Sequence, residues 1–339
     1  MGQREGDGLA RLRAALDGVG VGWGEVAEYE ELGGGTYNTV FRVRLAGRPG
    51  LVVKLAPASG SPGLRYERGI LATEARFYAL AGEVAGVETP AALPSAGGDG
   101  VSPDHLVMTE CAGTPWHALG DRIGAIERAP LRRELGRWTA ALHTITGDAF
   151  GYPAEPWGPL RATWREAFLE MVGAVLDDAG RFGVPLPRPA REIRGLFASR
   201  GPLLDEVTVP VLVHFDLWDG NILVDRGDGG PRLSALIDAE RAFWGDPLAE
   251  FVSLALFGDI EEDDAFLGGY RSGGGPAVID AAARERLALY RAYLYLIMWV
   301  EAVPRGFGAE HRDWLRQAVV RPLTAVLDAW AVEHRREGA

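Results

Sequence analysis

Residues 214–221 read HFDLWDGN, and residues 237–240, a short way downstream, read IDAE. The first motif follows the apolar run VLV at 211–213, which is typical of a short buried strand. Residues 222–225 and 233–237 are also strand-like, and the stretch RGDGGP between them predicts a hairpin. Chemically active side chains therefore gather where short strands end, and this part of the chain decides the fold.

These polar side chains match the requirements of phosphoryl transfer. That reaction needs a carboxylate to orient the attacking hydroxyl, oxygen ligands for magnesium, and a positive group for the nucleotide phosphates. Asp216 and Asn221 keep the H-x-D-x-x-x-x-N spacing of the protein-kinase catalytic loop, and Asp238 adds a second carboxylate. The alternative is that Asp216, Asn221 and Asp238 are loop side chains that cap turns or helices.

The positive group is indicated by an unusual composition. Of 35 basic residues, 34 are arginine and one is lysine, Lys54. It lies in the apolar run LVVKL at 51–55, which follows a glycine-rich turn at 33–36 and a strand-like stretch at 38–45. A compact ammonium fits a tight phosphate site better than the larger guanidinium fork does. The glycines by themselves are a weak signal, because an ordinary hairpin turn has the same composition.

The residues that follow complete a small sheet-rich region. Residues 71–80 read LATEARFYAL, which predicts a helix with Glu74 at the edge of its apolar face. Residues 105–110 predict another strand. The stretch CAGTP at 111–115 contains the glycine and proline that indicate a hinge or boundary.

Beyond that boundary the pattern is mainly helical. Apolar side chains recur at helical spacing through 131–145 and 164–175, where they indicate core packing more than cofactor contacts. The expected fold class is α+β. Residues 1–111 are expected to form a small antiparallel-sheet lobe with one main helix, and residues 112–339 a larger, mostly helical lobe with the catalytic loop.

In this order, the motifs resemble the aminoglycoside phosphotransferase and choline kinase-like family of small-molecule kinases, the phosphotransferase enzyme family, whose members are relatives of the protein kinases. The resemblance covers about residues 31–251 and is strongest over 212–250. It implies a protein-kinase-like two-lobe fold. It also implies transfer of the γ-phosphate of ATP, with Mg²⁺, to a hydroxyl of a small molecule.

The resemblance also assigns roles to particular residues. Asp216 becomes the catalytic base, His214 an organiser of its loop, Asn221 and Asp238 the magnesium ligands, and Lys54 the contact to the α- and β-phosphates. The remaining assignments are Glu74 as the partner of Lys54, the turn of Gly33, Gly34, Gly35, Thr36 and Asn38 over the phosphates, the backbone around Thr109 and Cys111 at the adenine, and Asp246 as a support of the catalytic loop.

Some assignments stay open. Glu67 lies about two helical turns before Glu74 and is an alternative partner of Lys54. Glu240 is either a contact to a second metal ion or a hydrogen-bonding residue of its loop. Phe215 departs from the family, which often has a small residue there. The chain has no D-F-G or A-P-E motif and no room for an activation segment, which argues against a protein kinase.

The acceptor is less well specified. Candidate contacts are Trp218, Asp219, Glu240 and Trp244, the predicted helix at 164–182, and the acidic run DIEEDD at 259–264. Near the pocket, that acidic run would attract a polycationic molecule; otherwise it is a solvated turn.

Three functions follow. The first is a phosphotransferase of an aminoglycoside-type or other antibiotic, a resistance kinase. The alternative is a metabolic kinase of a sugar, fructosamine or amino alcohol, because DLW at 216–218 followed by GN at 220–221 resembles the loop of fructosamine kinases. The third is a catalytically silent nucleotide-binding scaffold, against which the intact Lys54, Asp216, Asn221 and Asp238 argue.

Composition excludes other classes of partner. A net charge of -12 disfavours nucleic-acid binding and is compatible with a cationic substrate, although solubility alone also explains it. The longest apolar stretch, 287–303, contains Arg291 and Glu301 and predicts a core helix, not a membrane span. The amino terminus lacks the apolar run of a secretion signal. The single cysteine, Cys111, allows no internal disulfide and favours the cytoplasm. The oligomeric state is not predicted.

Overall fold

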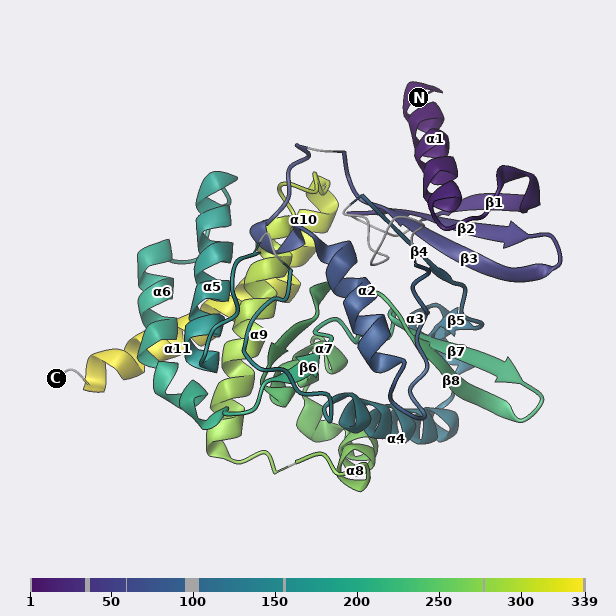
Figure 1. Cartoon of the computed structure of the whole chain (residues 1–339). Coiled ribbons are helices and arrows are strands. Elements are labelled where there is room, and N and C mark those ends of the chain that lie inside the picture. The colour runs from purple at the N-terminus through teal and green to yellow at the C-terminus, as the bar shows by residue number, and fades with distance from the viewer. Residues whose placement is uncertain are drawn as a thin grey trace. The chain divides into compact units, whose positions relative to one another are not determined.

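The computed structural model describes residues 2–33, 37–58, 60–94, 104–154, 157–276 and 278–337. The chain divides into two compact units (Figure 1). Unit 1 comprises Met1–Ser61, Gly69–Gly124 and Asp219–Glu240, and unit 2 comprises Pro62–Arg68, Ala125–Trp218 and Arg241–Ala339. These bounds differ from a single division at residue 111, because later segments of the chain complete a sheet of unit 1.

Unit 1 is built on two antiparallel sheets. One has four strands in the order β1-β2-β3-β4, and the other has three in the order β5-β7-β8. Its elements are α1 (Gly2–Gly18), β1 (Val26–Leu32), β2 (Thr39–Leu45), β3 (Arg48–Leu55), α2 (Ile70–Ala81), β4 (His105–Thr109), β5 (Thr114–Pro115), α3 (Trp116–Leu119), β7 (Ile222–Gly227) and β8 (Gly230–Leu236).

The two faces of the four-stranded sheet have different partners. Leu51, Val53 and Leu55 of β3 pack in a buried cluster with Leu12 and Leu16 of α1. Successive side chains of a strand point to opposite faces, so Lys54 lies on the face away from α1. The expectation of one main helix in this lobe is therefore incomplete. The helix α1 has a narrow apolar stripe in a glycine-rich, charged sequence, and its local signal is weak.

Unit 2 is mostly helical and contains one described two-stranded sheet, in which β6 pairs antiparallel with β9. Its elements are α4 (Ala125–Leu142), α5 (Trp164–Arg181), α6 (Ala190–Ser199), β6 (Val211–Val213), β9 (Phe243–Gly245), α7 (Phe251–Leu254), α8 (Asp264–Ser272), α9 (Ala281–Glu301), α10 (Ala309–Leu315), a π-helical turn (Arg316–Val320) and α11 (Arg321–Glu337).

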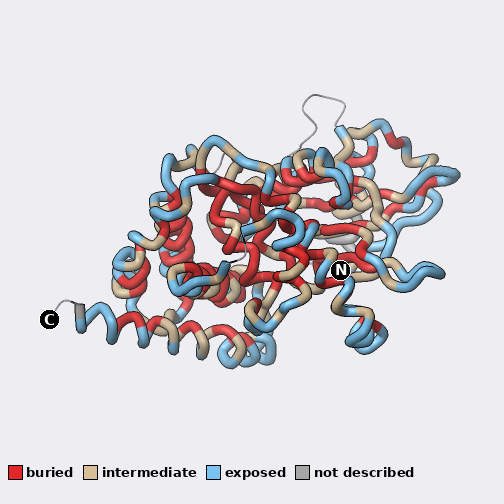
Figure 2. Tube along the Cα trace, turned by 90° about the horizontal axis from the view of Figure 1, so that it is seen from below, coloured by how far each residue is buried: buried red, intermediate tan, exposed pale blue. Residues whose placement is uncertain are grey.

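Helix α9 runs through the core of unit 2. Its Tyr290 and Tyr293 are buried and pack edge-on against Phe168 of α5, with ring centroids 5.2 and 5.4 Å apart. The expectation that this stretch is a core helix is confirmed. Among the described residues, no helix is both long and apolar enough to cross a membrane. Helix α11 is only partly buried, because its buried residues are separated by exposed ones along its length (Figure 2).

Helices α4 and α8 cross with almost no side chain between them. A methyl group added at Gly269 of α8 would lie 2.0 Å from the carbonyl oxygen of Arg133 on α4. One added at Gly136 of α4 would lie 2.2 Å from the carbonyl oxygen of Phe266 on α8. Backbone atoms cannot move aside as flexible side chains can, so the crossing requires glycine on both helices.

We expect Gly269→Ala to lower the free energy of unfolding by about 1–3 kcal/mol, because the added methyl group separates α4 from α8. Gly268→Ala is the matched control, since a methyl group there meets nothing within 4 Å. That control should be neutral or stabilising by up to about 1 kcal/mol, because alanine favours helix over glycine. Urea unfolding of both variants measures the difference, and equal stabilities would contradict the close crossing.

Candidate active site

The loop after β6 is held in a strained conformation. Phe215 has a φ of 63°, a left-handed value that is unusual for a bulky side chain. The backbone N–H groups of His214 and Phe215 donate to the two carboxylate oxygens of Glu250, at 2.7 and 2.9 Å. The N–H of Leu217 donates to Ser253 Oγ at 3.0 Å. Residues 250–253 therefore fix the backbone on either side of Asp216.

The support of this loop differs from the assignment made by resemblance. Asp246, the expected support, accepts hydrogen bonds from the Leu248 N–H and from the side chains of Arg286 and Tyr290. The backbone of the loop is instead held by Glu250. Burial raises the pKa of Glu250 to about 7, although the hydrogen bonds from the loop favour its ionised form. Sequence spacing did not single out Glu250, because its partners lie about 35 residues earlier.

Phe215 has a packing role. Its ring is fully buried and lies 4.9 Å from the ring of Phe243 and 5.7 Å from that of Tyr293. The departure from a small residue is therefore accommodated by the aromatic core of unit 2. Burying the ring also offsets part of the cost of the strained backbone.

Asp216 is half-buried and faces a buried arginine that the sequence did not single out. Its Oδ1 lies 3.8 Å from Nη1 of Arg241, and its N–H donates to His214 Nδ1 at 3.3 Å. Nη2 of Arg241 donates to both oxygens of Glu301, at 3.1 and 3.2 Å. The guanidinium therefore stabilises negative charge on Asp216 and is itself fixed by α9.

The same network includes Glu67. Its Oε1 accepts from Arg305 Nη2 at 2.5 Å, and that nitrogen also lies 3.2 Å from Glu301. Glu67 belongs to unit 2, whereas Lys54 belongs to unit 1. Of the two candidate partners of Lys54, Glu67 pairs with Arg305, and Glu74 is the one that binds Lys54, within unit 1.

Lys54 is the centre of a buried charge cluster in unit 1. Its side chain is 8% exposed, and Nζ donates to both oxygens of Glu74 at 2.7 Å and to Asp238 Oδ1 at 2.5 Å. Burial lowers the pKa of Lys54, but the carboxylates of Asp238, Glu74 and Glu240 together raise it further, so the net shift is upward. Lys54 is therefore held as an ammonium.

Tyr78 connects this cluster to the backbone and was missed by sequence reasoning. Its hydroxyl donates to Glu74 Oε1 at 2.6 Å and accepts from the N–H of Asp238 at 2.9 Å. Asp238 has a φ of 65°, which is uncommon outside glycine. Tyr78 lies one turn after Glu74 on α2, so the only sequence signal was an i, i+4 pair of polar groups.

The β7–β8 hairpin positions the two expected magnesium ligands. Ile222 pairs with Leu236, and the N–H of Ile237 donates to the carbonyl oxygen of Asn221 at 3.0 Å. Asn221 and Asp238 thus flank the open end of one antiparallel pair. The hairpin therefore determines where the backbones of Asn221 and Asp238 lie.

Oxygen ligands from Glu74, Asp238 and Glu240 lie within 4.8 Å of one another. Glu74 already binds Lys54 through both oxygens. Asp238 and Glu240 are the partly exposed carboxylates of this group, whereas Glu74 is buried. Carboxylate oxygens are the ligands that magnesium prefers.

Asn38 extends this group from the end of the glycine-rich turn. Its Nδ2 donates to Glu240 Oε2 at 2.8 Å, which gives Glu240 the loop contact that was one of its two expected roles. Asn38 Oδ1 is buried, and among the described residues it has no hydrogen-bond partner. Gly33 lies in a turn, and Gly34, Gly35 and Thr36 lie outside the described residues.

The expected adenine-binding backbone lies at the end of β4. The N–H groups of Thr109 and Glu110 donate to the carbonyl oxygens of Ala91 and Gly50, at 3.0 and 2.9 Å. These bonds fix the chain as it enters Cys111, which is half-buried. Burial raises the pKa of the Cys111 thiol to about 11, so this cysteine is not an activated nucleophile.

The substrate candidates occupy different environments. Trp218 and Asp219 are partly exposed, and the carbonyl oxygen of Asp219 accepts from the His117 N–H at 2.9 Å. Trp244 of β9 is buried and covers Gly147, where an added methyl group would lie 2.7 Å from the indole. Trp244 is thus a core residue, which corrects its assignment as an acceptor contact.

The acidic run is partly structural. Asp259 and Asp263 cap short helices by accepting from the backbone N–H groups of Glu261 and Phe266. Glu261 also pairs with Arg284 at 2.6 Å, and Asp263 pairs with Arg132 at 2.6 Å.

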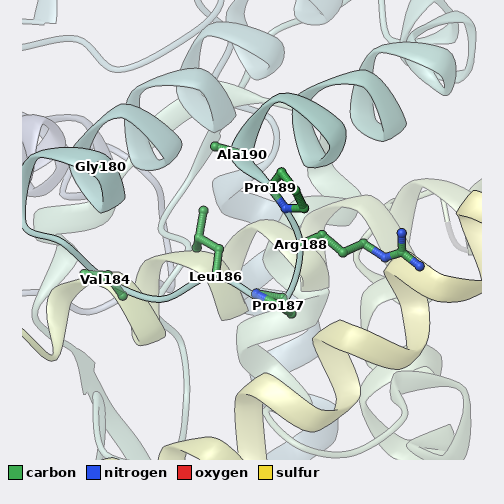
Figure 3. Close-up of a pocket in the computed structure, with 7 residues that line it drawn as sticks. All are labelled: Gly180, Val184, Leu186, Pro187, Arg188, Pro189 and Ala190. Carbon is green, nitrogen blue, oxygen red and sulfur yellow. The ribbon is translucent and has the colours of Figure 1, made fainter.

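A surface depression of about 490 Å³ lies between α5 and α6 in unit 2 (Figure 3). It is lined mainly by apolar side chains such as Val184 and Leu186, together with Arg188. Arg188 pairs with Asp328 at 2.6 Å. None of the lining residues is a candidate for phosphoryl transfer, so this depression does not define the active site.

Comparison with known proteins places this arrangement in a family. Residues 28–290 match the model of the phosphotransferase enzyme family. A protein of Synechocystis sp. named as a ketoamine kinase is 24% identical over 209 residues, which covers 60% of this chain and 62% of that protein. The viomycin phosphotransferase of Streptomyces vinaceus is 28% identical over 243 residues, or 70% of this chain and 77% of that protein.

Solved structures show the same fold. A structure named as a fructosamine-3-kinase from Thermobifida fusca has a TM-score of 0.67 and 22% identity, and the match covers 94% of this chain and 97% of that chain. The streptomycin–ATP complex of APH(2")-IIa has a TM-score of 0.60 and 17% identity, with 95% and 97% covered. The expected α+β, protein-kinase-like fold is thereby confirmed. Because the family model matches most of its length, the chain belongs to the phosphotransferase enzyme family.

Proposed function

We propose that the chain is a kinase that uses ATP and magnesium to phosphorylate a hydroxyl of a small molecule, most favourably an aminoglycoside-type or other cationic antibiotic. Membership of the phosphotransferase enzyme family supports phosphoryl transfer to a small molecule. The observation that carries the proposal is the contact of Lys54 with Glu74 and Asp238. A buried ammonium beside the partly exposed carboxylate of Asp238 provides both charges that a metal–nucleotide complex requires.

The donor atoms of unit 1 fit magnesium. Asp238 and Glu240 offer carboxylate oxygens, and Asn38 Oδ1 is a buried oxygen without a partner among the described residues. With Asn221 at the start of the hairpin, these are hard oxygen donors of the kind that Mg²⁺ binds. Bound magnesium would neutralise phosphate charge. In this proposal Lys54 binds the phosphates, the turn from Gly33 to Asn38 covers them, and the backbone at Thr109 and Cys111 receives the adenine.

Asp216 is the proposed catalytic base of unit 2. It orients the acceptor hydroxyl and takes its proton as the oxygen attacks phosphorus. The fixed backbone around Asp216 and the nearby Arg241 guanidinium hold its carboxylate in one place. His214 is buried and contributes through the backbone of the loop, so it is a positioning residue.

Two acceptor classes are favoured by different relatives. Viomycin phosphotransferase and the complex with streptomycin support an antibiotic, and the net charge of -12 suits a cationic one. The proteins named as ketoamine and fructosamine-3-kinases support a metabolic acceptor, which is the second candidate. A silent scaffold is disfavoured by the intact set of charged groups.

The experiment that tests the proposal is a coupled assay of ADP release with Mg-ATP. The acceptor panel contains aminoglycosides, viomycin, sugars, fructosamines and amino alcohols. Turnover with an antibiotic and survival of a susceptible host would support the first class, whereas turnover with only a fructosamine would support the second. Binding of ATP without turnover of any acceptor, under conditions where a known kinase of this family is active, would contradict the proposal.

We expect Asp216→Asn to fold normally and to lose about 10²–10⁴-fold in kcat, because the amide cannot accept the hydroxyl proton. Its thermal unfolding midpoint should remain close to that of the wild type, since the substitution keeps the shape of the side chain. The assay above measures the loss. Wild-type turnover in a correctly folded Asp216→Asn variant would refute the assignment of the base.

We expect Lys54→Arg to lose at least about tenfold in kcat/KM although it keeps the charge, because the guanidinium fork is larger than the space between Glu74 and Asp238. Lys54→Met, which removes the charge, is the comparison and should lose more. Steady-state kinetics with varied ATP measure both. If Lys54→Arg retained wild-type kinetics, charge alone would suffice and the shape argument would fail.

We expect Asp238→Ala to raise the magnesium concentration needed for half-maximal activity and to lower kcat, because a carboxylate ligand is lost. Asp225→Ala is the matched control on the same hairpin, where Asp225 pairs with Arg232 at 2.6 Å. A magnesium titration of each variant gives the comparison. Identical titrations of Asp238→Ala and the wild type would remove Asp238 from the metal site.

A further inference from the structure

The segment Pro62–Arg68, which we call the strap, packs in unit 2 although it lies in sequence between two parts of unit 1. The N–H of Arg65 donates to Asp178 Oδ2 at 2.6 Å. The guanidinium of Arg181 donates to the carbonyl oxygen of Gly63. Asp178 and Arg181 both belong to α5, so the backbone of the strap is bound to that helix.

Two buried side chains of the strap contact the end of α9 and the residues after it. The Tyr66 hydroxyl donates to Glu301 Oε2 at 3.1 Å. Glu67 Oε1 accepts from Nε and Nη2 of Arg305, at 3.0 and 2.5 Å. Burial raises the pKa of Glu67, and the charge of Arg305 opposes that rise. The ionised form of Glu67 therefore depends on Arg305.

The contacts of the strap lead to Arg241, the buried guanidinium beside Asp216. Nη2 of Arg241 donates to both oxygens of Glu301, at 3.1 and 3.2 Å. The ring of Tyr66 lies 6.0 Å from the guanidinium. Nη1 of Arg241 is 3.8 Å from Asp216 Oδ1, which is within reach of an ion pair but too long for a hydrogen bond. Arg241 thus attracts the charge on Asp216 while Nη1 does not bond to that oxygen.

The charge network, by which we mean Glu67, Glu301, Arg241 and Arg305, balances two carboxylates against two guanidiniums. Glu301 is shared, because its Oε2 lies 3.1 Å from Arg241 and 3.2 Å from Arg305. Glu67 supplies a second carboxylate to Arg305. Without Glu67, the buried charge of Arg305 would draw Glu301 toward itself, since a buried cation needs a partner. Arg241 would then lose part of its bond to Glu301 and pair directly with Asp216.

We propose that Glu67 of the strap and Arg305 are positioning residues for phosphoryl transfer. Their pair keeps Glu301 bound to Arg241 and thereby holds Arg241 at a distance from the Asp216 carboxylate. This inference rests on the proposed function, in which Asp216 is the base. A direct hydrogen bond from Arg241 would compete with the acceptor hydroxyl for Asp216 and would make the carboxylate less basic. The strap therefore acts on the reaction through Arg241, without a part in the chemistry itself.

The test begins with steady-state kinetics of the full chain and the acceptor found in the ADP-release assay. Glu67→Gln removes one negative charge and keeps the shape of the side chain. We expect kcat to fall about tenfold, because a small misplacement of a catalytic group is costly. The KM for ATP should stay within about twofold, since the groups proposed to bind the nucleotide belong to unit 1. Wild-type kcat in a folded Glu67→Gln variant would overturn the inference.

A second substitution separates positioning from damage to the core. Glu67→Gln/Arg305→Met removes both members of the pair, so that Arg305 no longer competes for Glu301. Glu301 then stays on Arg241, and we expect kcat to return to within about threefold of the wild type. If the pair contributed only to packing, the double variant would be no more active than Glu67→Gln. That result would overturn the inference.

Glu333→Gln is the matched control in the same unit. It removes a carboxylate partner of Arg200, whose side chain is 11% exposed, compared with 6% for Arg305. Arg200 lies outside the charge network as defined, so we expect kcat within about twofold of the wild type. A tenfold loss in Glu333→Gln would mean that any poorly paired arginine of unit 2 impairs turnover, and it would overturn the specific role of Glu67.

Urea unfolding distinguishes this inference from the proposed function, because it needs no turnover. When Glu67 is lost, Asp216 becomes a more important partner of Arg241. We therefore expect Asp216→Asn to lower the urea midpoint more in the Glu67→Gln chain than in the wild type, where little change is expected. Additive midpoint shifts would overturn the inference and leave the kinase function standing. Coupled shifts in a chain that phosphorylates no acceptor would support the control of Asp216 by the network and contradict the proposed function.

Discussion

The buried ammonium of Lys54 is the constraint on which unit 1 depends. A buried charge without a partner costs several kcal/mol, so Glu74 and Asp238 must both lie within reach of Nζ. The Tyr78 hydroxyl bonds Glu74 and the backbone of Asp238, which joins α2 to the end of the β7–β8 hairpin. Parts of the chain as far apart as residues 54 and 238 are thereby held as one electrostatic group.

In unit 2 the main constraint is the strained loop that carries Asp216. The left-handed backbone at Phe215 is kept by two N–H bonds to Glu250 and by burial of the Phe215 ring. Because Glu250 is itself buried, its hydrogen bonds to the loop compensate for the loss of solvent. Arg241, fixed by Glu301, adds a positive charge behind Asp216. The position of Asp216 thus depends on contacts from Glu250, α7 and α9.

The two units bear differently on the choice of acceptor. In the proposed function, the charged groups of unit 1 bind a metal and a nucleotide, which any kinase of the family would need whatever its acceptor. In the same proposal, discrimination between acceptors depends on exposed residues outside these charged groups. These residues follow no motif, because exposed contacts can vary without disturbing the core.

The local sequence pattern was enough to predict the placement of residues whose position follows from the strand or turn beside them. The H-x-D-x-x-x-x-N spacing, the hairpin before Asp238, and Lys54 on its strand all follow from turn composition and apolar alternation, which act over a few residues. The antiparallel-sheet and helical regions were predictable for the same reason. The helix α1 was underestimated, since its narrow stripe has meaning only against the sheet it covers.

Partner choice over long separations was decided by the tertiary structure alone. Sequence spacing allowed either Glu67 or Glu74 to pair with Lys54. In the structure Glu74 pairs with Lys54, and Glu67 pairs with Arg305. In the same way, Glu250 supports the loop, Arg241 lies beside Asp216 as its counter-charge, and Trp244 is buried in the core. Each is a contact between residues far apart in sequence. A sequence pattern records which side chains are available, whereas burial and chain packing determine which of them meet.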